Sequence, residues 1–383
     1  MLVKDPIRYA MIGGGEGAFI GPVHRTAAAI AGNCQLVAGA LSSDPERARR
    51  SGEAIGLAPD RSYTSIADLI AGEKARPDGA EFIAIVTPNH VHAPAAIAAL
   101  EAGFPVLCDK PLTDTLQAAF DIEAAAQRTG GMLGVTHTYN AYPMARQARE
   151  LITGGKYGAV RRVAVKYTQG WLAKAEDGVG KQAEWRTDPK RSGLAGAFGD
   201  IGTHAFNLVE FMTGETVTKL AAELRAAVEG RQLDDDGMAM FHLHGGGRGT
   251  LVASQVCTGD ANGLAISIWC EDAGFHWDQE HPNHLRVNPR GQPEQTWTPG
   301  VDRKYLGEPA MIVTRTPSGH PEGYLEAFAN IYHDFAKAVR GETLAHPAFT
   351  DLADAMRGMK FIQAAHDSSA QGAAWVDIDG VTA

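Results

Sequence analysis

Cysteine is scarce in this sequence. Only four of the 383 residues are Cys, they lie far apart, and no two of them have the CxxC spacing of a redox or zinc motif. Four scattered thiols do not form the disulfide framework that stabilises small secreted domains. We therefore exclude a disulfide-dependent fold and predict a cytoplasmic protein with reduced thiols.

Long apolar runs and an excess of positive charge are missing as well. No stretch of about 18 apolar residues suits a membrane span, and the first ten residues lack the apolar core of a secretory signal. The formal net charge is −10, which disfavours nucleic acid as a partner. With 44% hydrophobic and 21% charged residues the composition is that of a globular protein, and the length predicts two domains.

Apolar runs alternate with helical segments through residues 1–138. The runs at 7–12, 35–41 and 82–88 are continuous, which is typical of parallel strands buried on both faces. Such a βαβα alternation predicts a doubly wound parallel sheet, so the first domain is expected to be α/β.

The pattern changes over residues 139–383. Segments such as 219–228 and 238–246 read as strands, several of them with alternating apolar and polar residues, and amphipathic helices follow at 322–341 and 349–372. We predict an α+β domain with a large, mostly antiparallel open sheet, whose late helices can pack back on the first domain.

A glycine-rich loop, IGGGEGAFIGPVHR at 12–25, follows the first predicted strand. Glycines at such a turn let backbone amides approach a pyrophosphate, and the N-terminus of the next helix adds a favourable partial charge. Gly13 and Gly15 supply the G-x-G step, and the third small residue is either Ala18 or, after a three-residue insertion, Gly21. We prefer Gly21 as the close-packing glycine, while a flexible loop without a ligand is the alternative. The predicted dinucleotide contacts in this loop are Gly13, Gly15, Ala18, Phe19, Ile20 and Gly21.

The end of the second strand carries no acidic residue. An aspartate there would hold the ribose hydroxyls of NAD and repel the 2′-phosphate of NADP. The position is Ser42, with Ser43 and Arg47 close behind, so these three are predicted cofactor contacts and the cofactor is NAD or NADP. The alternative is that Asp44 only caps a helix, with Pro45 at its first position, and that the arginines nearby form a solvated face.

Two further segments carry a family resemblance. They are VTPNHVHAPAAIAALEAGFPVLCDKPLT at 86–113 and SGLAGAFGDIGTHAFNLVEFMTG at 192–214. Together with the glycine loop they resemble the glucose–fructose oxidoreductase, inositol dehydrogenase and rhizopine-catabolism (Gfo/Idh/MocA) family, in order and spacing, from residue 7 to about residue 340. The resemblance implies a Rossmann domain, then a domain for substrate binding and oligomerisation. It also implies NAD(P)-dependent oxidation of a ring hydroxyl of a sugar, sugar derivative or cyclitol, and a homodimer or homotetramer formed through the open sheet face.

The resemblance also assigns residues. The tripeptide DKP at 109–111 matches the family motif E-K-P, whose lysine, here Lys110, lies between nicotinamide and substrate. Asp200 and His204 match the motif D-x-G-x-H, and Asn207 stands where the family often has a second acid, which leaves open which hydroxyls are recognised. The residues that match the cofactor-lining segments are Thr87, Pro88, Asn89, His92, Asp109 and Lys110.

These residue types suit the oxidation of an alcohol, in which a hydride goes to nicotinamide and a proton goes to a base. Histidine titrates near neutral pH, so we assign His204 as the general base, oriented or relayed by Asp200 four residues earlier on one helix face. Lys110 would hydrogen-bond the reacting oxygen and stabilise its alkoxide character. The alternatives are a solvated lysine and a helix-capping Asp–His pair.

Substrate contacts are predicted among aromatic, amide and charged side chains near these motifs. Aromatic faces suit the C–H faces of a ring, and amides suit its hydroxyls, although ordinary core aromatics are the alternative for each. His24, near the glycine loop, is predicted to be structural. The candidates are Lys110, Tyr139, Asn140, Gln169, Trp171, Trp185, Arg186, Asp200, His204 and His320.

Two polar clusters are interpreted as surface features. Three histidines in the His276–His284 segment lie beside acidic residues, but their spacing fits no compact ligand pattern, so we predict a surface loop and no metal site. The acidic triplet at 234–236 is predicted to be a solvated turn before a strand.

Two other activities stay open. An enzyme on the same scaffold could retain its nucleotide and run a redox cycle for glycoside cleavage or epimerisation, in which case the purified protein would carry nicotinamide. A non-enzymatic dinucleotide sensor is the third hypothesis, but a sensor has no need of Lys110 and His204 as they stand.

Overall fold

The structure, a computed structural model, describes residues 5–175, 186–301 and 304–382. The chain divides into two compact units, each described by itself below. The first unit comprises Met1–His137 and Phe328–Met356, and the second comprises Thr138–Ala327 and Arg357–Ala383. Trp185, one of the predicted substrate contacts, lies outside the described residues.

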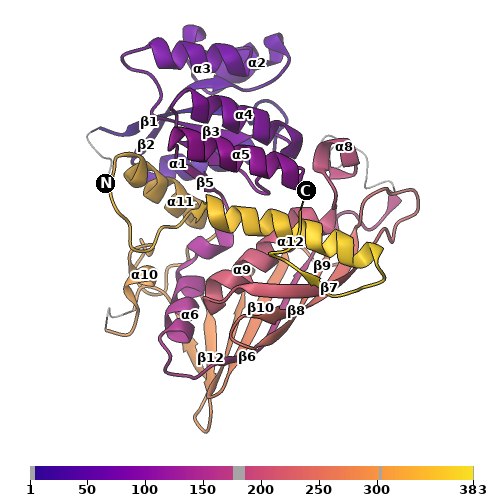
Figure 1. Cartoon of the computed structure of the whole chain (residues 1–383). Helices are drawn as coiled ribbons and strands as arrows, with labels where there is room; N and C mark the ends of the chain where they lie inside the picture. Colours follow the sequence, from indigo (N-terminus) through magenta and orange to yellow (C-terminus); the bar gives the residue numbers. More distant parts are fainter. Residues whose placement is uncertain (1–4, 176–185, 302–303, 383) are drawn as a thin grey trace. The chain divides into compact units, whose positions relative to one another are not determined.

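A six-stranded sheet forms the first unit, in the order β14-β5-β4-β3-β1-β2. Strands β1, β2, β3 and β5 of this sheet are labelled in Figure 1. Strands β1 to β5 are parallel, and β14 is antiparallel to β5. The predicted doubly wound parallel sheet is therefore confirmed. The strand order reverses between β1 and β3, and ligands of such sheets bind beyond the carboxyl ends of the strands at that point. The strands are β1 (Ile7–Gly13), β2 (Cys34–Ala40), β3 (Phe82–Val86), β4 (Val106–Cys108), β5 (Leu133–Val135) and β14 (Thr350–Asp351).

Side-chain caps explain where three helices of this unit begin. Asp44, Ser65 and Thr115 each accept a hydrogen bond from the backbone N–H three residues further on. The capping by Asp44 that the sequence analysis considered is thus confirmed. The helices are α1 (Ile20–Ala31), α2 (Pro45–Ala54), α3 (Ile66–Ala75), α4 (Asn89–Glu101) and α5 (Leu116–Thr129), with the 3-10 turn η1 (Pro59–Arg61) and the part of α11 (Tyr324–Val339) that starts at Phe328.

The second unit is built on a nine-stranded sheet, in the order β13-β12-β11-β10-β6-β9-β8-β7-β15. Its neighbouring strands are antiparallel except for the parallel pair β6 and β9, so the predicted large, mostly antiparallel sheet is confirmed. The strands are β6 (Val160–Thr168), β7 (Val217–Arg225), β8 (Asp236–Leu243), β9 (Arg248–Ser254), β10 (Gly263–Cys270), β11 (Ala273–Asp278), β12 (Leu285–Pro289), β13 (Gln295–Trp297) and β15 (Val376–Asp377).

Helices cover one face of this sheet. Phe206 and Val209 of α9 and Phe361 of α12 pack against apolar side chains of β7, β8 and β9. On the other face Met238 and Met240 are 56% and 54% exposed. The elements outside the sheet are η2 (Thr138–Ala141), α6 (Pro143–Thr153), α8 (Pro189–Ser192), η4 (Phe198–Gly202), α9 (Thr203–Thr213), α10 (Glu308–Met311) and the part of α12 (Leu352–Ala370) from Arg357 on.

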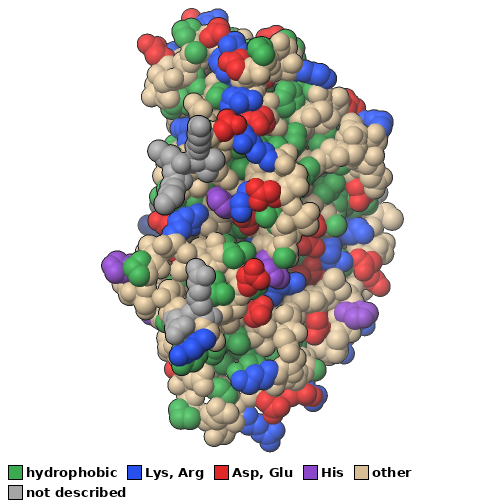
Figure 2. All heavy atoms as spheres, turned by 90° about the vertical axis from the view of Figure 1, so that its left-hand side faces the viewer, with side chains coloured by type: hydrophobic (Ala, Val, Ile, Leu, Met, Phe, Trp, Pro, Cys, Tyr) green, Lys and Arg blue, Asp and Glu red, His purple; other side chains and the backbone are tan. Residues whose placement is uncertain are grey.

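One face of the protein carries charges of both signs. Among the described residues on the face shown in Figure 2, acidic and basic side chains are interspersed, so the net charge of −10 does not come from one acidic patch there. In the described part of the chain, no helix is long and apolar enough to cross a membrane.

Candidate active site

Functional side chains of the first unit gather at one edge of its sheet. Gly13 ends β1, Thr87 follows β3, and Lys110 and His137 follow β4 and β5 by two residues each. Because these strands are parallel, their carboxyl ends meet at the same edge. Gly13 pairs with Val86 where the strand order reverses, so the glycine loop and the lysine motif lie on the edge where a ligand is expected.

Three glycines of the loop leave no room for a side chain. A Cβ on Gly13, whose φ is +84°, would lie 2.7 Å from Thr87 Cγ2, and one on Gly15 would lie 2.4 Å from the carbonyl oxygen that follows β2. A Cβ on Gly21 would lie 2.2 Å from the Gly14 carbonyl oxygen, so Gly21 packs α1 directly against the loop. These glycines have no side chains to cover the backbone where α1 begins. Backbone N–H groups at such a helix N-terminus can bind a pyrophosphate. The residues present therefore fit a bound dinucleotide.

Neighbouring contacts hold this loop in place. The backbone N–H of Glu16 donates to Ser51 Oγ at 3.0 Å, and Arg50 pairs with Glu16 at 3.3 Å, so α2 braces the loop. Ala18 closes a turn by donating to the Gly15 carbonyl at 3.0 Å. Phe19 is 62% exposed directly before Ile20, the first residue of α1. Next to β2, Ser42 Oγ accepts the backbone N–H of Asp44 at 3.1 Å, and Ser43 and Arg47 are exposed.

Replacing Gly21 with alanine is expected to weaken NAD binding by about tenfold and to lower the melting temperature. The new methyl group must push α1 away from Gly14, and overpacking of this kind costs about 1–3 kcal/mol. Calorimetric titration with NAD measures the change. The matched control is Gly358→Ala in α12, because a Cβ at Gly358 meets nothing within 4 Å. An unchanged dissociation constant in Gly21→Ala would contradict the assignment of the loop.

His92 joins two parts of the predicted nicotinamide-lining segment. Its side chain is fully buried, with Nε2 2.8 Å from the Thr87 carbonyl oxygen and Nδ1 3.0 Å from the Pro111 carbonyl oxygen. Burial lowers its pKa, so the neutral ring donates to one of the two carbonyls at a time. Pro88 and Asn89 form the turn into α4. His92 thus fixes this turn relative to the backbone beside Lys110.

A buried carboxylate lies next to Lys110 in the chain. Asp109 accepts a hydrogen bond from Thr136 Oγ1 at 2.7 Å, and His24 Nε2 is 3.7 Å from the same carboxylate oxygen. Burial raises the pKa of Asp109, but His24, Lys110 and Thr136 together hold it well below its usual range. His24 is fully buried with Nδ1 2.8 Å from the Tyr332 hydroxyl, so it is a core residue, as predicted.

His137, at the same edge, was not predicted from the sequence. Burial and the positive charge of Lys110 lower its pKa to about 3, so the ring is neutral at physiological pH. His137 follows the end of β5 by the same two residues that separate Lys110 from the end of β4, so the position after a strand end could have revealed it.

In the second unit Asp200 and His204 lie on a helix with an unusual start. The turn η4 has π-helical bonding, in which the Thr203 N–H donates to the Phe198 carbonyl five residues earlier. Such turns are rare and are frequent at functional sites. His204, on the first turn of α9, is 8% exposed, and the Tyr139 ring meets it edge-on at 4.8 Å between centroids.

Asp200 accepts hydrogen bonds from side chains of two other segments. Its Oδ2 accepts hydrogen bonds from Arg186 Nε at 3.1 Å and from Gln255 Nε2 at 2.9 Å. The Arg186 guanidinium also lies over the Trp171 ring, at 5.8 Å from the centroid. Arg186 was a predicted substrate contact, whereas Gln255 was not predicted, because it lies 55 residues away from Asp200 in the chain.

Polar groups beside His204 form a network around Asn262. The Tyr139 and Tyr167 hydroxyls are 2.6 Å apart, Tyr167 donates to Asn262 Oδ1 at 2.7 Å, and Gln169 Nε2 donates to the same oxygen at 2.9 Å. Gln169 in turn accepts from Trp171 Nε1 at 2.9 Å. The structure therefore brings three predicted substrate contacts together with two residues, Tyr167 and Asn262, that the sequence analysis missed.

The predicted contacts Asn140 and His320 have different surroundings. Asn140 Nδ2 donates to Asn207 Oδ1 at 2.6 Å, so the residue that replaces the family acid is paired with another amide. His320 is exposed and contacts Ser318 and Thr316 of its own turn.

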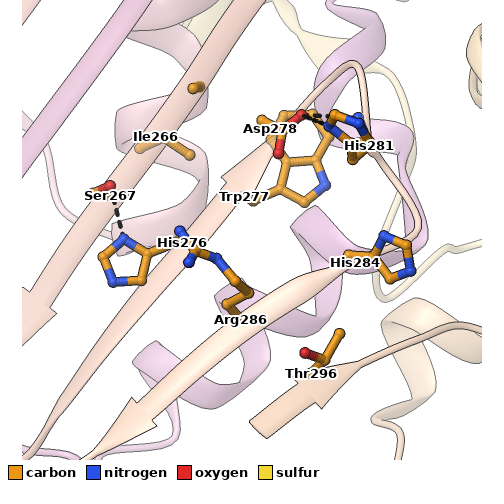
Figure 3. Close-up of a pocket in the computed structure, with 10 residues that line it drawn as sticks. Ile266, Ser267, His276, Trp277, Asp278, His281, His284, Arg286 and Thr296 are labelled. Atoms are coloured by element: carbon orange, nitrogen blue, oxygen red, sulfur yellow. Dashed lines mark hydrogen bonds and ion pairs between the residues drawn. The ribbon is translucent and has the colours of Figure 1, made fainter. Parts of the chain in front are cut away.

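Two interpretations of polar clusters need correction. His276 lies on β11 rather than in a loop, and its Nδ1 is 2.9 Å from Ser267 Oγ. Residues 279–284 form a surface turn, as predicted, and His281 and His284 line a hollow of about 480 Å³ with Arg286 (Figure 3). A strand was missed here because its apolar run is short. Among the described residues, no group of three His, Cys, Asp or Glu side chains is placed to hold a metal ion.

The acidic triplet at 234–236 is not a solvated turn. Asp234 accepts hydrogen bonds from the backbone N–H groups of Gly196 and Phe198, at 2.6 and 2.8 Å. Asp235 is 2% exposed and accepts from two backbone N–H groups of the preceding turn. Both carboxylates accept backbone N–H groups of neighbouring turns, which a run of acids in the sequence does not reveal.

Comparisons with known proteins place the chain in a family. Residues 7–137 match the family model described as "Oxidoreductase family, NAD-binding Rossmann fold", and residues 145–276 match "GFO/IDH/MocA C-terminal domain". The chain is 32% identical to the uncharacterized oxidoreductase YfiI of Bacillus subtilis, over 98% of both chains. It is 26% identical to levoglucosan dehydrogenase of Pseudarthrobacter phenanthrenivorans, over 78% of this chain and 80% of that protein.

Solved structures agree with this placement. An inositol dehydrogenase homolog from Azotobacter vinelandii complexed with NAD+ is 34% identical, with a TM-score of 0.93 over 98% of both chains. The same homolog complexed with NADH and myo-inositol gives a TM-score of 0.90, again over 98% of both chains. The chain therefore belongs to the Gfo/Idh/MocA family and is an NAD(P)-dependent dehydrogenase with an NAD-binding Rossmann domain.

Proposed function

We propose that this enzyme oxidises a ring CH–OH group of a neutral cyclitol or sugar, with Lys110, Asp200 and His204 as its catalytic residues. The observation that carries the proposal is the network in the second unit, where His204 lies beside the Tyr139–Tyr167–Asn262 hydroxyl and amide groups. Amides and hydroxyls of this kind recognise hydroxyl groups. Arg186, whose guanidinium lies over the Trp171 ring, is paired with Asp200, so a neutral polyol suits the cluster better than a phosphorylated one.

Each catalytic residue has a separate task in this proposal. When bound, NAD supplies the hydride acceptor. His204 takes the proton of the reacting hydroxyl, and Asp200, four residues earlier on the same segment, orients His204 or relays its proton. Lys110 donates a hydrogen bond to the reacting oxygen and stabilises its negative charge. Gln169 and Trp171 contact the neighbouring part of the ring.

Asn262 is expected to set substrate affinity. Because its amide holds Tyr167 and Gln169 together, Asn262→Ala should raise KM for the polyol by about tenfold or more and change kcat less, since a lost polar contact is worth roughly 1–3 kcal/mol. Steady-state kinetics at saturating NAD measure the split. Asn288→Ala, at an exposed position of β12, is the control and should change neither constant. A fall in kcat alone would argue against substrate positioning by Asn262.

The proposal is tested with a panel of polyols. The relatives direct its order: myo-inositol first, because it is bound in the structure of the inositol dehydrogenase homolog, then levoglucosan, aldoses and glycosides. Purified protein is incubated with NAD or NADP, and the absorbance of reduced nicotinamide is followed. We expect turnover with at least one neutral cyclitol or sugar. If no compound is turned over by protein that carries bound nicotinamide, the result would favour the enzyme that retains its nucleotide and runs a redox cycle.

A further inference from the structure

One residue outside the catalytic set holds the start of the catalytic segment. Three consecutive backbone N–H groups, those of Gly196, Ala197 and Phe198, donate to Asp234: the first and third to its carboxylate at 2.6 and 2.8 Å, the second to its backbone carbonyl at 2.8 Å. The first turn of a helix leaves its N–H groups without partners inside the helix. Asp234 supplies those partners from a position 36 residues further along the chain.

The contact between the two segments is also close. A Cβ on Gly196 would lie 2.1 Å from the Asp234 carbonyl oxygen, so only glycine allows this approach. The backbone N–H of Asp200 donates to the Gly196 carbonyl at 2.9 Å, which links the anchored residue directly to the first catalytic residue. The backbone carbonyl of the next residue, Asp235, accepts the backbone N–H of Gln255 at 2.8 Å, and Gln255 donates to the Asp200 carboxylate. A substitution of the Asp235 side chain leaves that backbone bond in place.

We propose that Asp234 is a positioning residue of this dehydrogenase, which sets the rotation and height of the Phe198–His204 turn so that Asp200 and His204 face the substrate. The proposal rests on the proposed function of those two residues. Asp234 itself touches neither substrate nor cofactor in this scheme. Its effect passes through backbone hydrogen bonds, so its loss is expected to lower kcat rather than cofactor affinity.

The ionised form of Asp234 is disfavoured in the folded protein. Burial raises its pKa from an ordinary value of 3.8 to about 6, against the lowering effect of the two N–H donors, and the neighbouring Asp235 raises it further. The other charged groups nearby are Arg231, at 3.6 Å from Asp235, and Arg186, which pairs with Asp200. The folded protein therefore binds the proton of the Asp234 carboxyl group more tightly than the unfolded chain does. The stability gained from this bound proton is lost as pH rises through about 6.

The test compares two neighbouring carboxylates in the full-length enzyme. Asp234→Asn keeps the shape, removes the charge and turns one acceptor into a donor facing an N–H. We expect kcat with NAD and the substrate found by the panel to fall about 10- to 100-fold, with KM for NAD within about threefold of the parent. The melting temperature of Asp234→Asn minus that of the parent should increase from pH 4 to pH 8, because only the parent loses the stability of the Asp234 proton. Asp235→Asn is the matched control, because its carboxylate accepts backbone N–H groups of Ala227 and Val228 instead. It should lower stability and leave kcat within about threefold.

Hydrogen exchange followed by mass spectrometry gives a readout that needs no substrate. Asp234→Asn should speed exchange of amides 196–204, and Asp235→Asn should speed exchange near 226–229 instead. Gly196→Ala, which pushes the same two backbones apart, should reproduce the first pattern. Equal exchange of amides 196–204 in both aspartate variants, or an unchanged kcat in Asp234→Asn, would overturn the proposal. Failure of the proposed function would look different: the parent would turn over none of the polyols, or His204→Ala would stay active, while the exchange pattern still reports on Asp234.

Discussion

Replacing His204 with alanine is expected to lower kcat by about 10²–10⁴-fold, which is the contribution of a positioned general base. The KM for NAD should change little, because the glycine cradle that fits the dinucleotide belongs to the other unit of the chain. Initial rates of NADH formation with the polyol found by the panel measure both constants. The large effect is expected because the neighbouring groups cannot take over the proton.

The two tyrosines beside His204 are poor substitutes for it. Burial raises the pKa of Tyr139, although its hydrogen bonds with Tyr167 and Asn262 lower it, and burial raises the pKa of Tyr167 well above its ordinary value. Both hydroxyls therefore keep their protons at the pH of the reaction and can only donate or accept hydrogen bonds. Asp200 is already engaged by Arg186 and Gln255. His204 is the group of this cluster whose ordinary pKa lies near neutrality.

The control for this variant is His281→Ala. His281 is exposed and pairs with Asp278 at 2.9 Å, and its ring is not among the groups described around Asp200 and His204, so its loss should leave kcat unchanged. Added imidazole should partly restore His204→Ala, because the cavity left by the ring can admit a small base. A kcat within tenfold of the parent would instead make His204 a core partner of Tyr139, and the base would have to be sought elsewhere.

Periodicity in the sequence was sufficient to predict the fold. Continuous runs such as FIAIV at 82–86 can only be buried on both faces, and alternating runs such as MAMFHL at 238–243 leave one face exposed. The two-residue strands β14 and β15 could not be predicted in this way, since they depend on pairing with β5 and β7, more than 100 residues earlier. Two residues carry no periodicity.

The candidate site was predictable only where it is local in sequence. Lys110, Asp200 and His204 belong to compact motifs, whereas Asn262 and Gln255 reach the site through folding of strands that lie 55 to 95 residues away from their partners. Asp234 was misinterpreted for a related reason. A run of three acids is usually solvated, and only the Gly196–Phe198 backbone, which the fold brings next to Asp234, turns the Asp234 carboxylate into an acceptor of backbone hydrogen bonds.

Lys110→Ala is the second variant with a large expected effect, a fall in kcat of about 10²–10³-fold, comparable to the loss of one oxyanion donor. Removing the ammonium takes away the positive charge that stabilises the developing alkoxide. The KM for NAD should stay within about threefold of the parent value. The control Lys74→Ala, at an exposed position of α3, should change neither kcat nor KM. Stopped-flow absorbance separates hydride transfer from product release, so that a slow chemical step can be attributed to the lysine.

An independent signal distinguishes lost chemistry from lost structure in this variant. The charge of Lys110 lowers the pKa of His137, so the pKa of His137 should rise from about 3 in Lys110→Ala, although burial keeps it below its ordinary value. NMR of the imidazole resonances can follow that titration. One outcome is that kcat falls, the pKa of His137 rises, and Asp109 keeps its hydrogen bond to Thr136. In that case the site is intact and the lysine itself is catalytic. If kcat is unchanged while the pKa of His137 rises, Lys110 serves only as the counter-charge of Asp109. The reacting oxygen must then be stabilised by another donor.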